Sequence, residues 1–274
     1  MEYILASSHL PQGEISSVVD FKKQGSIYTC ELEFAGKKDL QKFKTILCNN
    51  FFPGQAIGLR PKEFFPKAVF MDMDGTIICE ESCVHLAGRI GRAESFASLT
   101  DQAMQGEIDF STSFNQRSKM LGSVTKEDVI NTAKQLSLQK GVKELLAACR
   151  NNNISLFLAT GGFDTFAQYF VDLLGFHDYC ASKASYTSSG HLYFGKGDLI
   201  VTGEYKSKWM HDVCLQRGWQ ASEVVAIGDG ANDQHMLEAA GVGVGFCPKE
   251  ALIPHIDVYN DLADHSFLLD FFGV

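Results

Sequence analysis

Two aspartates stand two positions apart directly after a short apolar run, in the segment AVFMDMDGT that covers residues 68–76. If the run is a buried strand, Asp72 and Asp74 lie in the turn after it, where both carboxylates can point into one site. Their repulsion is tolerable beside a divalent cation, and Mg²⁺ prefers carboxylate and carbonyl oxygens. A carboxylate can also attack phosphorus as a covalent nucleophile. For this pair alone, the alternative is an acidic turn that caps the next helix.

A second candidate follows the apolar run ISLFLAT (154–160), which ends in Thr160-Gly161-Gly162. The pattern predicts that these residues close a strand and open a helix. A hydroxyl and unhindered backbone N–H groups at a helix N-terminus form an anion site. Ordinary turn chemistry explains the segment nearly as well.

Lys206 lies in GEYKSKWM, at the start of a predicted helix. A cation is unfavourable there, because the helix dipole prefers anions near its N-terminus. The placement is explained if the ammonium of Lys206 points at a bound phosphate. Lys208 fits a solvated helix face better, and the choice of Lys206 as the phosphate-binding lysine rests largely on the family resemblance that the motifs carry together.

The fourth cluster is GDGAND (228–233), where Asp229 and Asp233 follow another apolar run. We expect Asp229 to contact a cation directly and Asp233 to hold a coordinated water or orient the lysine. Asp233 could instead cap the following helix. Each cluster alone is ambiguous, but four of them in this order at successive strand ends argue against chance.

Short apolar strands and amphipathic helices alternate after Lys67 and would position these clusters. The patterns predict strands at 68–72, 154–160, 223–229 and 242–246 and helices at 142–150, 164–174, 206–217 and 232–240. This alternation predicts an α/β fold, a Rossmann-like parallel sheet with helices on both faces. Ligands bind outside the carboxyl ends of the strands in such sheets, so the four clusters should meet at one crevice.

Two other segments break the alternation. Residues 80–140 are rich in Ser, Ala and Gln and mainly helical in pattern, which predicts a helical cap inserted after the first core strand. Residues 1–65 are predicted to form a small α+β domain, with a strand near 16–21, a turn at KKQGS, a strand at 26–34 and a helix from Lys38. The proline-containing stretch 53–66 is interpreted as a linker. The phosphatase-like core would then comprise residues 66–79 and 141–274.

Composition narrows the class of protein. The net charge of −9 argues against nucleic-acid binding, which depends on Lys and Arg neutralising backbone phosphates. No apolar stretch is long enough to span a membrane, and no basic segment precedes the apolar N-terminal residues, so a cytoplasmic protein is expected. The eight cysteines include no CxxC pair, and we expect them to be reduced side chains without a metal or redox role.

The four motifs together resemble those of the haloacid dehalogenase-type hydrolases: DMDGT, the Thr of ATGG, Lys206 and GDGAND. With Asp74 present, the chain resembles the phosphatase branch of these hydrolases, because true dehalogenases lack this second acid. Over roughly residues 67–250 the chain is most similar to the phosphoserine phosphatase family. GEIDFSTSFNQRSKML, ATGGFDTFAQYF and VVAIGDGANDQHMLEAAGVGVGF carry that closer resemblance.

The resemblance implies a role for each acidic residue at the centre. Asp72 would be the nucleophile and a Mg²⁺ ligand. Asp74 would protonate the leaving alcohol, later activate water, and offer its backbone carbonyl to Mg²⁺. Asp229 would complete the metal ligands supplied by the protein.

The same resemblance implies a set of phosphate-binding groups. Thr160 and the backbone of Gly161 and Gly162 would hold phosphate oxygens, and Lys206 would neutralise their charge. Asn232 would contact the substrate, and Asp233 would support the lysine and water.

Selectivity is expected from the cap. By the resemblance, Glu81 would bind the ammonium of the substrate, Arg117 would bind its carboxylate, and Phe110 would supply an apolar wall. A planar guanidinium suits bidentate carboxylate binding. Val84 and His85 stand where phosphoserine phosphatases usually carry an Asp-Glu pair, which changes the charge beside the expected ammonium site.

The expected function is therefore Mg²⁺-dependent hydrolysis of a small phosphorylated metabolite through an aspartyl phosphate. Phosphoserine, and with it L-serine biosynthesis, is the favoured assignment, and a similarly small phosphomonoester is the runner-up. Two alternatives remain: a phosphotransferase that uses the same intermediate, and a regulatory protein with a decayed site. The second is disfavoured because every catalytic position is filled. Neither nucleic acid nor membrane is an expected partner, and a homodimer is left open.

Overall fold

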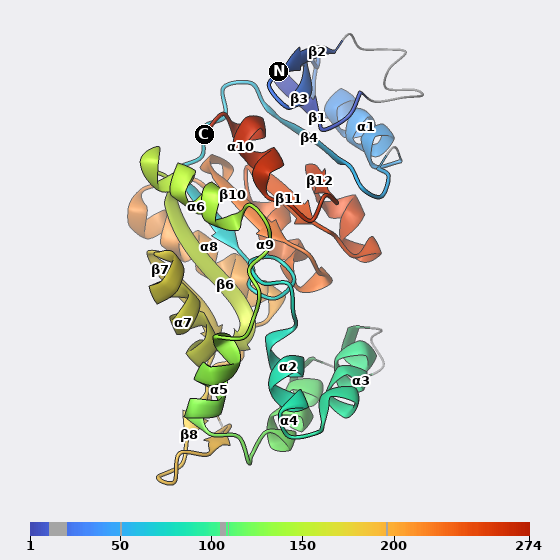
Figure 1. Cartoon of the computed structure of the whole chain (residues 1–274). Coiled ribbons are helices and arrows are strands. Elements are labelled where there is room, and N and C mark those ends of the chain that lie inside the picture. The colour runs from blue at the N-terminus through green and yellow to red at the C-terminus, as the bar shows by residue number, and fades with distance from the viewer. Residues whose placement is uncertain (11–20, 50, 105–107, 109, 196) are drawn as a thin grey trace.

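The computed structural model describes residues 1–10, 21–49, 51–104, 108, 110–195 and 197–274, with residues 101, 103, 104, 110 and 111 described by their backbone alone. Within this part of the chain, ten strands join into one sheet in the order β2-β3-β1-β4-β12-β11-β10-β5-β6-β7 (Figure 1). Their bounds are β1 Glu2–Ser7, β2 Lys22–Gln24, β3 Ile27–Glu33, β4 Ala56–Pro61, β5 Ala68–Met71, β6 Ser155–Phe163, β7 Asp178–Ser182, β10 Val224–Gly228, β11 Val242–Phe246 and β12 Val258–Asn260.

The six strands from β12 to β7 pair in parallel. β5, β10 and β11 read AVFM, VVAIG and VGVGF, and every residue in them is buried. Continuous apolar strands of this kind lie at the centre of parallel sheets, because helices cover both faces. The predicted α/β fold is confirmed, and all four predicted core strands belong to this sheet.

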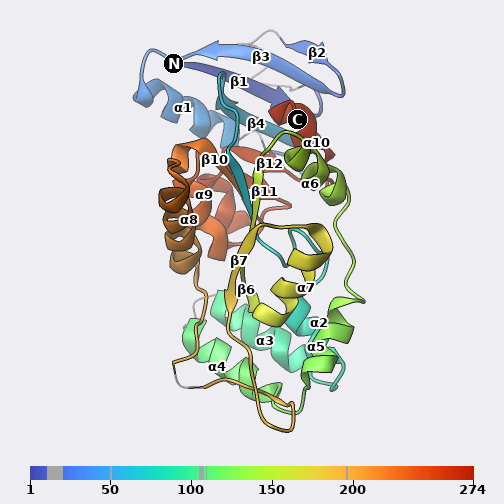
Figure 2. The same cartoon turned by 90° about the vertical axis from the view of Figure 1, so that its left-hand side faces the viewer.

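Helices cover the parallel sheet on both faces (Figure 2). One layer contains α6 Val142–Asn151, α7 Asp164–Leu174 and α10 Ser266–Phe272, and the other contains α8 Gly203–Arg217 and α9 Gln234–Ala239. Side chains of a strand alternate between the two faces. In β5, Val69 and Met71 therefore enter the core with Phe170 of α7, whereas Phe70 enters the opposite core with Met210 of α8.

The N-terminal strands extend this sheet instead of forming a separate one. β1 pairs antiparallel with β3 and β4, and β4 pairs antiparallel with β12. The linker interpretation of residues 53–66 was wrong, because Ala56–Pro61 form β4 and its first four residues are buried. The prolines at 53, 61 and 66 delimit this strand. The helix expected from Lys38 is α1 Lys37–Cys48, and the strand expected near 16–21 lies largely outside the described residues.

The segment between β5 and α6 is helical, as predicted for the cap. It contains α2 Ser82–Gly88, α3 Ala93–Met104, α4 Phe110–Met120 and α5 Lys126–Ala133, which lie at the end of the molecule opposite the chain termini (Figure 1). A small hairpin of β8 Ser185–Tyr186 and β9 Leu192–Tyr193, which the sequence patterns did not indicate, forms an isolated bridge to Thr125 just before α5. The division into domains at residues 65, 80 and 140 stays a prediction. Among the described residues, no helix is long and apolar enough to cross a membrane.

Candidate active site

A pocket of about 520 Å³ lies at the carboxyl ends of β5, β6 and β10, beneath the cap. Most of the predicted site residues line it: Asp72, Asp74, Glu81, Arg117, Thr160, Gly161, Gly162, Asp229 and Asn232. Lys206 and Asp233 lie in its buried floor, where neither side chain is exposed. The structure thus brings residues from four distant segments to one place, as expected for the strand ends of a parallel sheet.

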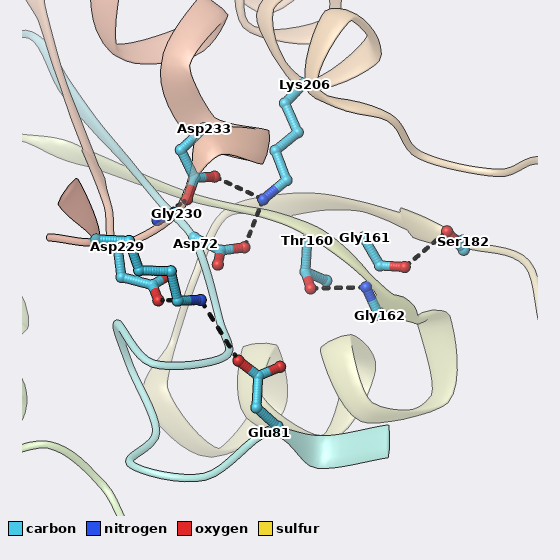
Figure 3. Close-up of polar contacts among 11 residues, drawn as sticks. Asp72, Glu81, Thr160, Gly161, Gly162, Ser182, Lys206, Asp229, Gly230 and Asp233 are labelled. Carbon is cyan, nitrogen blue, oxygen red and sulfur yellow. Dashed lines mark hydrogen bonds and ion pairs between the residues drawn. The ribbon is translucent and has the colours of Figure 1, made fainter. Parts of the chain in front are cut away.

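Lys206 links two aspartates in the floor of the pocket (Figure 3). Its Nζ donates to Asp72 Oδ1 at 2.6 Å and to Asp233 Oδ1 at 2.7 Å. Burial alone would lower the pKa of Lys206, but Asp233 and Asp72 outweigh this and raise it, so the lysine stays charged. Burial and the neighbouring Asp233 raise the pKa of Asp72, and Lys206 opposes that rise. The lysine therefore compensates the charge of a carboxylate that is held away from bulk water.

Asp233 has a second contact that fixes its orientation. Its other oxygen, Oδ2, accepts a hydrogen bond of 3.3 Å from Gly230 N across the short helix η2, Ala231–Asp233. One oxygen therefore contacts the lysine, as one alternative expected, whereas the other closes the turn before α9 and forms no side-chain cap of α9 itself. A Cβ at Gly228 would lie 2.4 Å from the Asp233 carboxyl carbon, so only glycine fits in this position of GDGAND.

Three carboxylates could hold a divalent cation. One oxygen each of Asp72, Asp229 and Asp233 lies within 4.8 Å of the others, and all three residues are buried. Hard cations such as Mg²⁺ prefer oxygen donors of this kind. In Figure 3 the second carboxylate oxygen of Asp72 points away from Lys206. The donor set therefore fits a divalent cation, and it includes Asp233 beside the two acidic side chains, Asp72 and Asp229, that the sequence interpretation proposed as metal ligands.

Asp74 lies at the boundary between core and cap. Its Oδ1 accepts a 2.8 Å hydrogen bond from Ser82 N in the first turn of α2. Its Oδ2 would lie 3.4 Å from a Cβ at Gly162, so this oxygen faces the glycine pair at the end of β6. Burial, reinforced by the charge of Glu81, raises the pKa of Asp74 to about 7. A carboxyl group in this state can give and take a proton near neutral pH.

The segment Thr160-Gly161-Gly162 differs from the prediction. The strand β6 continues through it to Phe163, with a register shift against β7 after Ala159, and α7 begins only at Asp164. The glycines therefore form a bulge near the carboxyl end of β6 and are not the first turn of a helix. Ser182 Oγ of β7 holds the bulge by donating to Gly161 O at 2.9 Å, and Thr160 Oγ1 accepts from Gly162 N at 2.9 Å (Figure 3).

The cap supplies the opposite wall of the pocket. Glu81 immediately precedes α2, and its side chain is half exposed. Arg117 of α4 donates from Nη1 to Thr100 Oγ1 at 3.2 Å and lies over the ring of Phe96, 5.4 Å from its centroid. The side chain of Phe110 lies outside the described part of the chain. One turn further along α4, Phe114 lines the pocket.

Several pocket residues were not singled out from the sequence: Phe96, Phe114, Phe163 and Lys249. Phe114 precedes Arg117 by three positions, so a common helix face would have indicated it. Lys249 follows the strand β11 at its carboxyl end, and that position is the signal that could have found it. His85, by contrast, is exposed, and Val84 is the neighbour that reaches the pocket.

A family profile described as haloacid dehalogenase-like hydrolase matches residues 66–241. This match covers more than half of the chain and includes all four motifs. The chain belongs to the haloacid dehalogenase-like hydrolase family.

Curated relatives narrow the class further. A phosphoserine phosphatase of Albidiferax ferrireducens is 32% identical over 225 residues, which are 80% of this chain and 94% of the relative. That of Haemophilus influenzae is 32% identical over 213 residues, 76% of this chain and 67% of the relative. That of Archaeoglobus fulgidus is 30% identical over 200 residues, and the match spans only 56% of that longer protein. The chain is a phosphoric monoester hydrolase similar to phosphoserine phosphatases.

Solved structures agree with this placement. A family hydrolase from Salmonella enterica serovar Typhi shares the fold over 99% of this chain and 98% of its own, with a TM-score of 0.82 at 20% identity. A phosphoserine phosphatase solved as a phospho-aspartyl intermediate analogue is 25% identical, with a TM-score of 0.70 over 76% of this chain and 99% of its own. The first likeness covers nearly the whole chain, so the shared fold includes the N-terminal strands.

Proposed function

We propose that this protein is a Mg²⁺-dependent phosphatase that hydrolyses phosphoserine through a covalent aspartyl phosphate on Asp72. One observation carries the proposal. The Asp72 carboxylate lies at a strand end, 2.6 Å from the Lys206 ammonium and within 4.8 Å of carboxylate oxygens of Asp229 and Asp233. A carboxylate nucleophile beside a fixed cation and an oxygen-rich cation site is what phosphoryl transfer requires, because catalysis depends on positioning and charge neutralisation.

In the first step, an oxygen of Asp72 attacks phosphorus and the bond between phosphorus and the ester oxygen breaks. Asp74 gives its proton to the leaving alcohol oxygen. Its Oδ2 faces the Gly162 side of the pocket, while Oδ1 is held by Ser82 N, so one oxygen is anchored and the other is available for this transfer. The leaving group departs as a neutral alcohol.

In the second step, Asp74 takes a proton from a water molecule, whose oxygen attacks the phosphorus. The bond from phosphorus to Asp72 breaks, which restores the carboxylate and releases inorganic phosphate. Asp74 is again protonated, so each turnover consumes one water and leaves both aspartates in their starting states. Asp74 therefore acts first as a general acid and then as a general base, because one carboxyl group can donate a proton in one step and accept one in the next.

Phosphate oxygens are held by groups that the core presents. The Thr160 hydroxyl accepts from Gly162 N, which leaves its own proton for a phosphate oxygen, and the Gly161 backbone lies beside it in the pocket wall. Lys206 carries the positive charge that offsets the phosphoryl group, and Asn232 lies at the rim as a substrate contact. Asp233 keeps the Lys206 ammonium in place.

The cation would be held by Asp72 and Asp229, with the backbone carbonyl of Asp74, and Asp233 is close enough to orient its water shell. When bound, Mg²⁺ supplies positive charge that stabilises the negative charge developing on the phosphoryl oxygens. At the centre itself, three carboxyl groups meet two ammonium groups, because Asp72 and Asp233 contact Lys206 and Asp229 contacts Lys249. This excess of acids supports a divalent cation.

Phosphoserine is favoured because the cap presents a carboxylate and a guanidinium on the same side of the pocket. Glu81 suits the substrate ammonium, and Arg117 suits its carboxylate. Relatives from several organisms are phosphoserine phosphatases by name, which supports the same substrate and a place in L-serine formation. A cytoplasmic location and a homodimer stay predictions, which cell fractionation and light scattering of the purified protein would test.

Phosphate release from phosphoserine with Mg²⁺ tests the proposal. Asp72→Asn should reduce the rate by at least about 10³-fold, because the nucleophile is lost while the shape of the site is kept. Asp212→Asn is the matched control, since Asp212 is exposed on α8 and should leave the rate unchanged. If Asp72→Asn released phosphate from phosphoserine as fast as the wild type, Asp72 would not be the nucleophile. If added alcohols became phosphorylated, the enzyme would be a phosphotransferase instead.

A further inference from the structure

Lys249 lies between the cap and the core of the pocket. Its Nζ is 3.1 Å from Asp229 Oδ2 and 3.8 Å from Glu81 Oε1. Asp229 ends a core strand, whereas Glu81 precedes the first cap helix, so one ammonium touches the two parts of the protein that enclose the substrate. In the described part of the chain, Lys249 is the basic residue that forms ion pairs with both Glu81 and Asp229.

The backbone of Lys249 is anchored in the core, whereas its side chain is partly exposed. Lys249 N donates to Asp229 O at 2.8 Å, and Lys249 O accepts from Leu252 N as the short helix η3, Glu250–His255, begins. The side chain remains 44% exposed. Lys206 is the opposite case, fully buried with contacts of 2.6 and 2.7 Å. Of the two ammonium groups, that of Lys249 is the one that can be displaced without opening the core.

The contact with Asp229 uses an oxygen that also faces the turn after β5, residues 72–76 (the nucleophile loop). A Cβ at Gly75 would lie 2.7 Å from Asp229 Oδ2, so this oxygen lies against the turn that carries Asp72 and Asp74. Lys249 contacts the same oxygen. A cation that approaches Asp229 from Asp72 must therefore share this carboxylate with the ammonium or replace it.

We propose that Lys249 is a positioning residue that holds Glu81 beside Asp229 and releases Asp229 when a divalent cation binds there. Released from Asp229, the ammonium stays near Glu81 until the positively charged group of the substrate takes its place. This inference rests on the proposed function, because it requires both a cation at Asp229 and a cationic substrate group at Glu81.

The consequence is that Lys249 weakens cation binding in the substrate-free protein. Removing its charge leaves Asp229 with no competing partner and makes the centre more negative. The affinity for Mg²⁺ should then rise, because a positive charge close to the incoming cation has been removed. A merely structural role predicts the reverse, since a damaged site binds its cation less well.

Calorimetric titration of the substrate-free protein with Mg²⁺ measures this directly and needs no turnover. Lys249→Met should bind Mg²⁺ about three- to tenfold more tightly than the wild type, because one partly exposed charge near the cation is lost. Lys249→Arg keeps the charge and should return the affinity to near the wild-type value. Lys208→Met removes an exposed lysine of α8 and serves as the matched control without effect.

Lys249→Gln, which is polar and of similar length, gives a second variant if Lys249→Met unfolds. Equal or weaker Mg²⁺ binding in the folded variant would overturn the role of Lys249 and leave the proposed phosphatase intact. Failure of the wild type itself to bind Mg²⁺ would instead overturn the cofactor of the proposed function, and the inference with it. At saturating Mg²⁺, the KM for phosphoserine should fall in Lys249→Met while kcat changes little, since Glu81 loses its competing partner.

Discussion

The core side and the cap side of the pocket differ in how firmly they hold their charged groups. On the core side, Lys206, Asp72 and Asp233 are buried and joined by contacts of 2.6 and 2.7 Å. On the cap side, Glu81 is half exposed, and its ion pair with Lys249 spans 3.8 Å. Under the proposed function, this difference corresponds to a division of labour in which the parallel strands fix the groups that would act on phosphorus, and the inserted helices present those that would select the alcohol.

The largest effect is expected on the core side. Lys206→Met should reduce kcat by at least about 10²-fold, because the phosphoryl group loses a preorganised positive charge. It should also lower the free energy of unfolding by about 3–5 kcal/mol, because two buried carboxylates lose their partner. Steady-state kinetics and urea denaturation measure the two losses. A folded Lys206→Met variant with nearly unchanged kcat would contradict the claim that groups on the core side act on the phosphoryl group.

Gly75 tests how closely the nucleophile loop must approach Asp229. Its φ is +70°, and a Cβ would lie 2.7 Å from Asp229 Oδ2. Gly75→Ala should lower kcat/KM by about 10²-fold, because small displacements of reacting groups are costly. Gly54 has a φ of +75° with open space around it, so Gly54→Ala should lose only about 1–2 kcal/mol of stability and keep its activity. Equal activities of the two variants would argue against close packing at the site.

On the cap side, substitution should change selection more than chemistry. Arg117→Met should raise the KM for phosphoserine about 10- to 100-fold, which corresponds to ~1.5–3 kcal/mol for hydrogen bonds to a charged group. Hydrolysis of a phosphate ester without a carboxylate, such as p-nitrophenyl phosphate, is the control and should change little. Similar losses with both substrates would place Arg117 in the chemistry and blur the division between the two sides.

The smallest expected effect is on the pH dependence of the free energy of unfolding, and it comes from His265, which lies behind the nucleophile loop. His265 is fully buried, stacks on Phe246 and contacts Thr76 O through Nε2 at 2.9 Å. Burial lowers its pKa to about 4, so the native state stays neutral where the unfolded chain, with a pKa near 6.5, binds a proton. The stability of the native state with a neutral His265 is therefore complete above pH 6.5 and decreases as the pH falls toward 4. The free energy of unfolding should be lower by about 2 kcal/mol at pH 5 from this residue alone.

Urea denaturation at pH 8 and pH 5 measures that contribution. The wild type should lose about 2 kcal/mol more than His265→Gln between these values, since the variant has no titrating ring. The difference between the two proteins removes the effect of other groups that titrate in the same range. An equal loss in both proteins would mean that His265 is protonated in the native state.

Much of the core was predictable because its signals are local. AVFM, VVAIG and VGVGF are buried on both faces, so each strand appears as a continuous apolar run without knowledge of its neighbours. The rule that parallel strands present ligands at their carboxyl ends then brought the four motifs to one crevice. The roles given to Asp72, Asp74, Thr160, Lys206 and Asp229 stay predictions until they are tested by substitution.

What could not be predicted depends on pairing between distant segments. β4 looked like a linker because its prolines are visible locally, whereas its partners β1 and β12 are not. The glycine pair after Thr160 became a bulge because Ser182 of β7 holds Gly161 O. Lys249 is a single lysine after a strand, and only the fold shows that it lies between Glu81 and Asp229.

Trapping the covalent intermediate tests the central claim most directly. The enzyme would be mixed with phosphoserine and Mg²⁺, quenched in acid during turnover, digested and examined by mass spectrometry. The peptide that contains Asp72 should carry the added mass of one phosphoryl group in the wild type and should be unmodified in Asp72→Asn. An enzyme that turns over phosphoserine with Asp72 unmodified at every quench time, or with the phosphoryl group on another residue, would contradict the account.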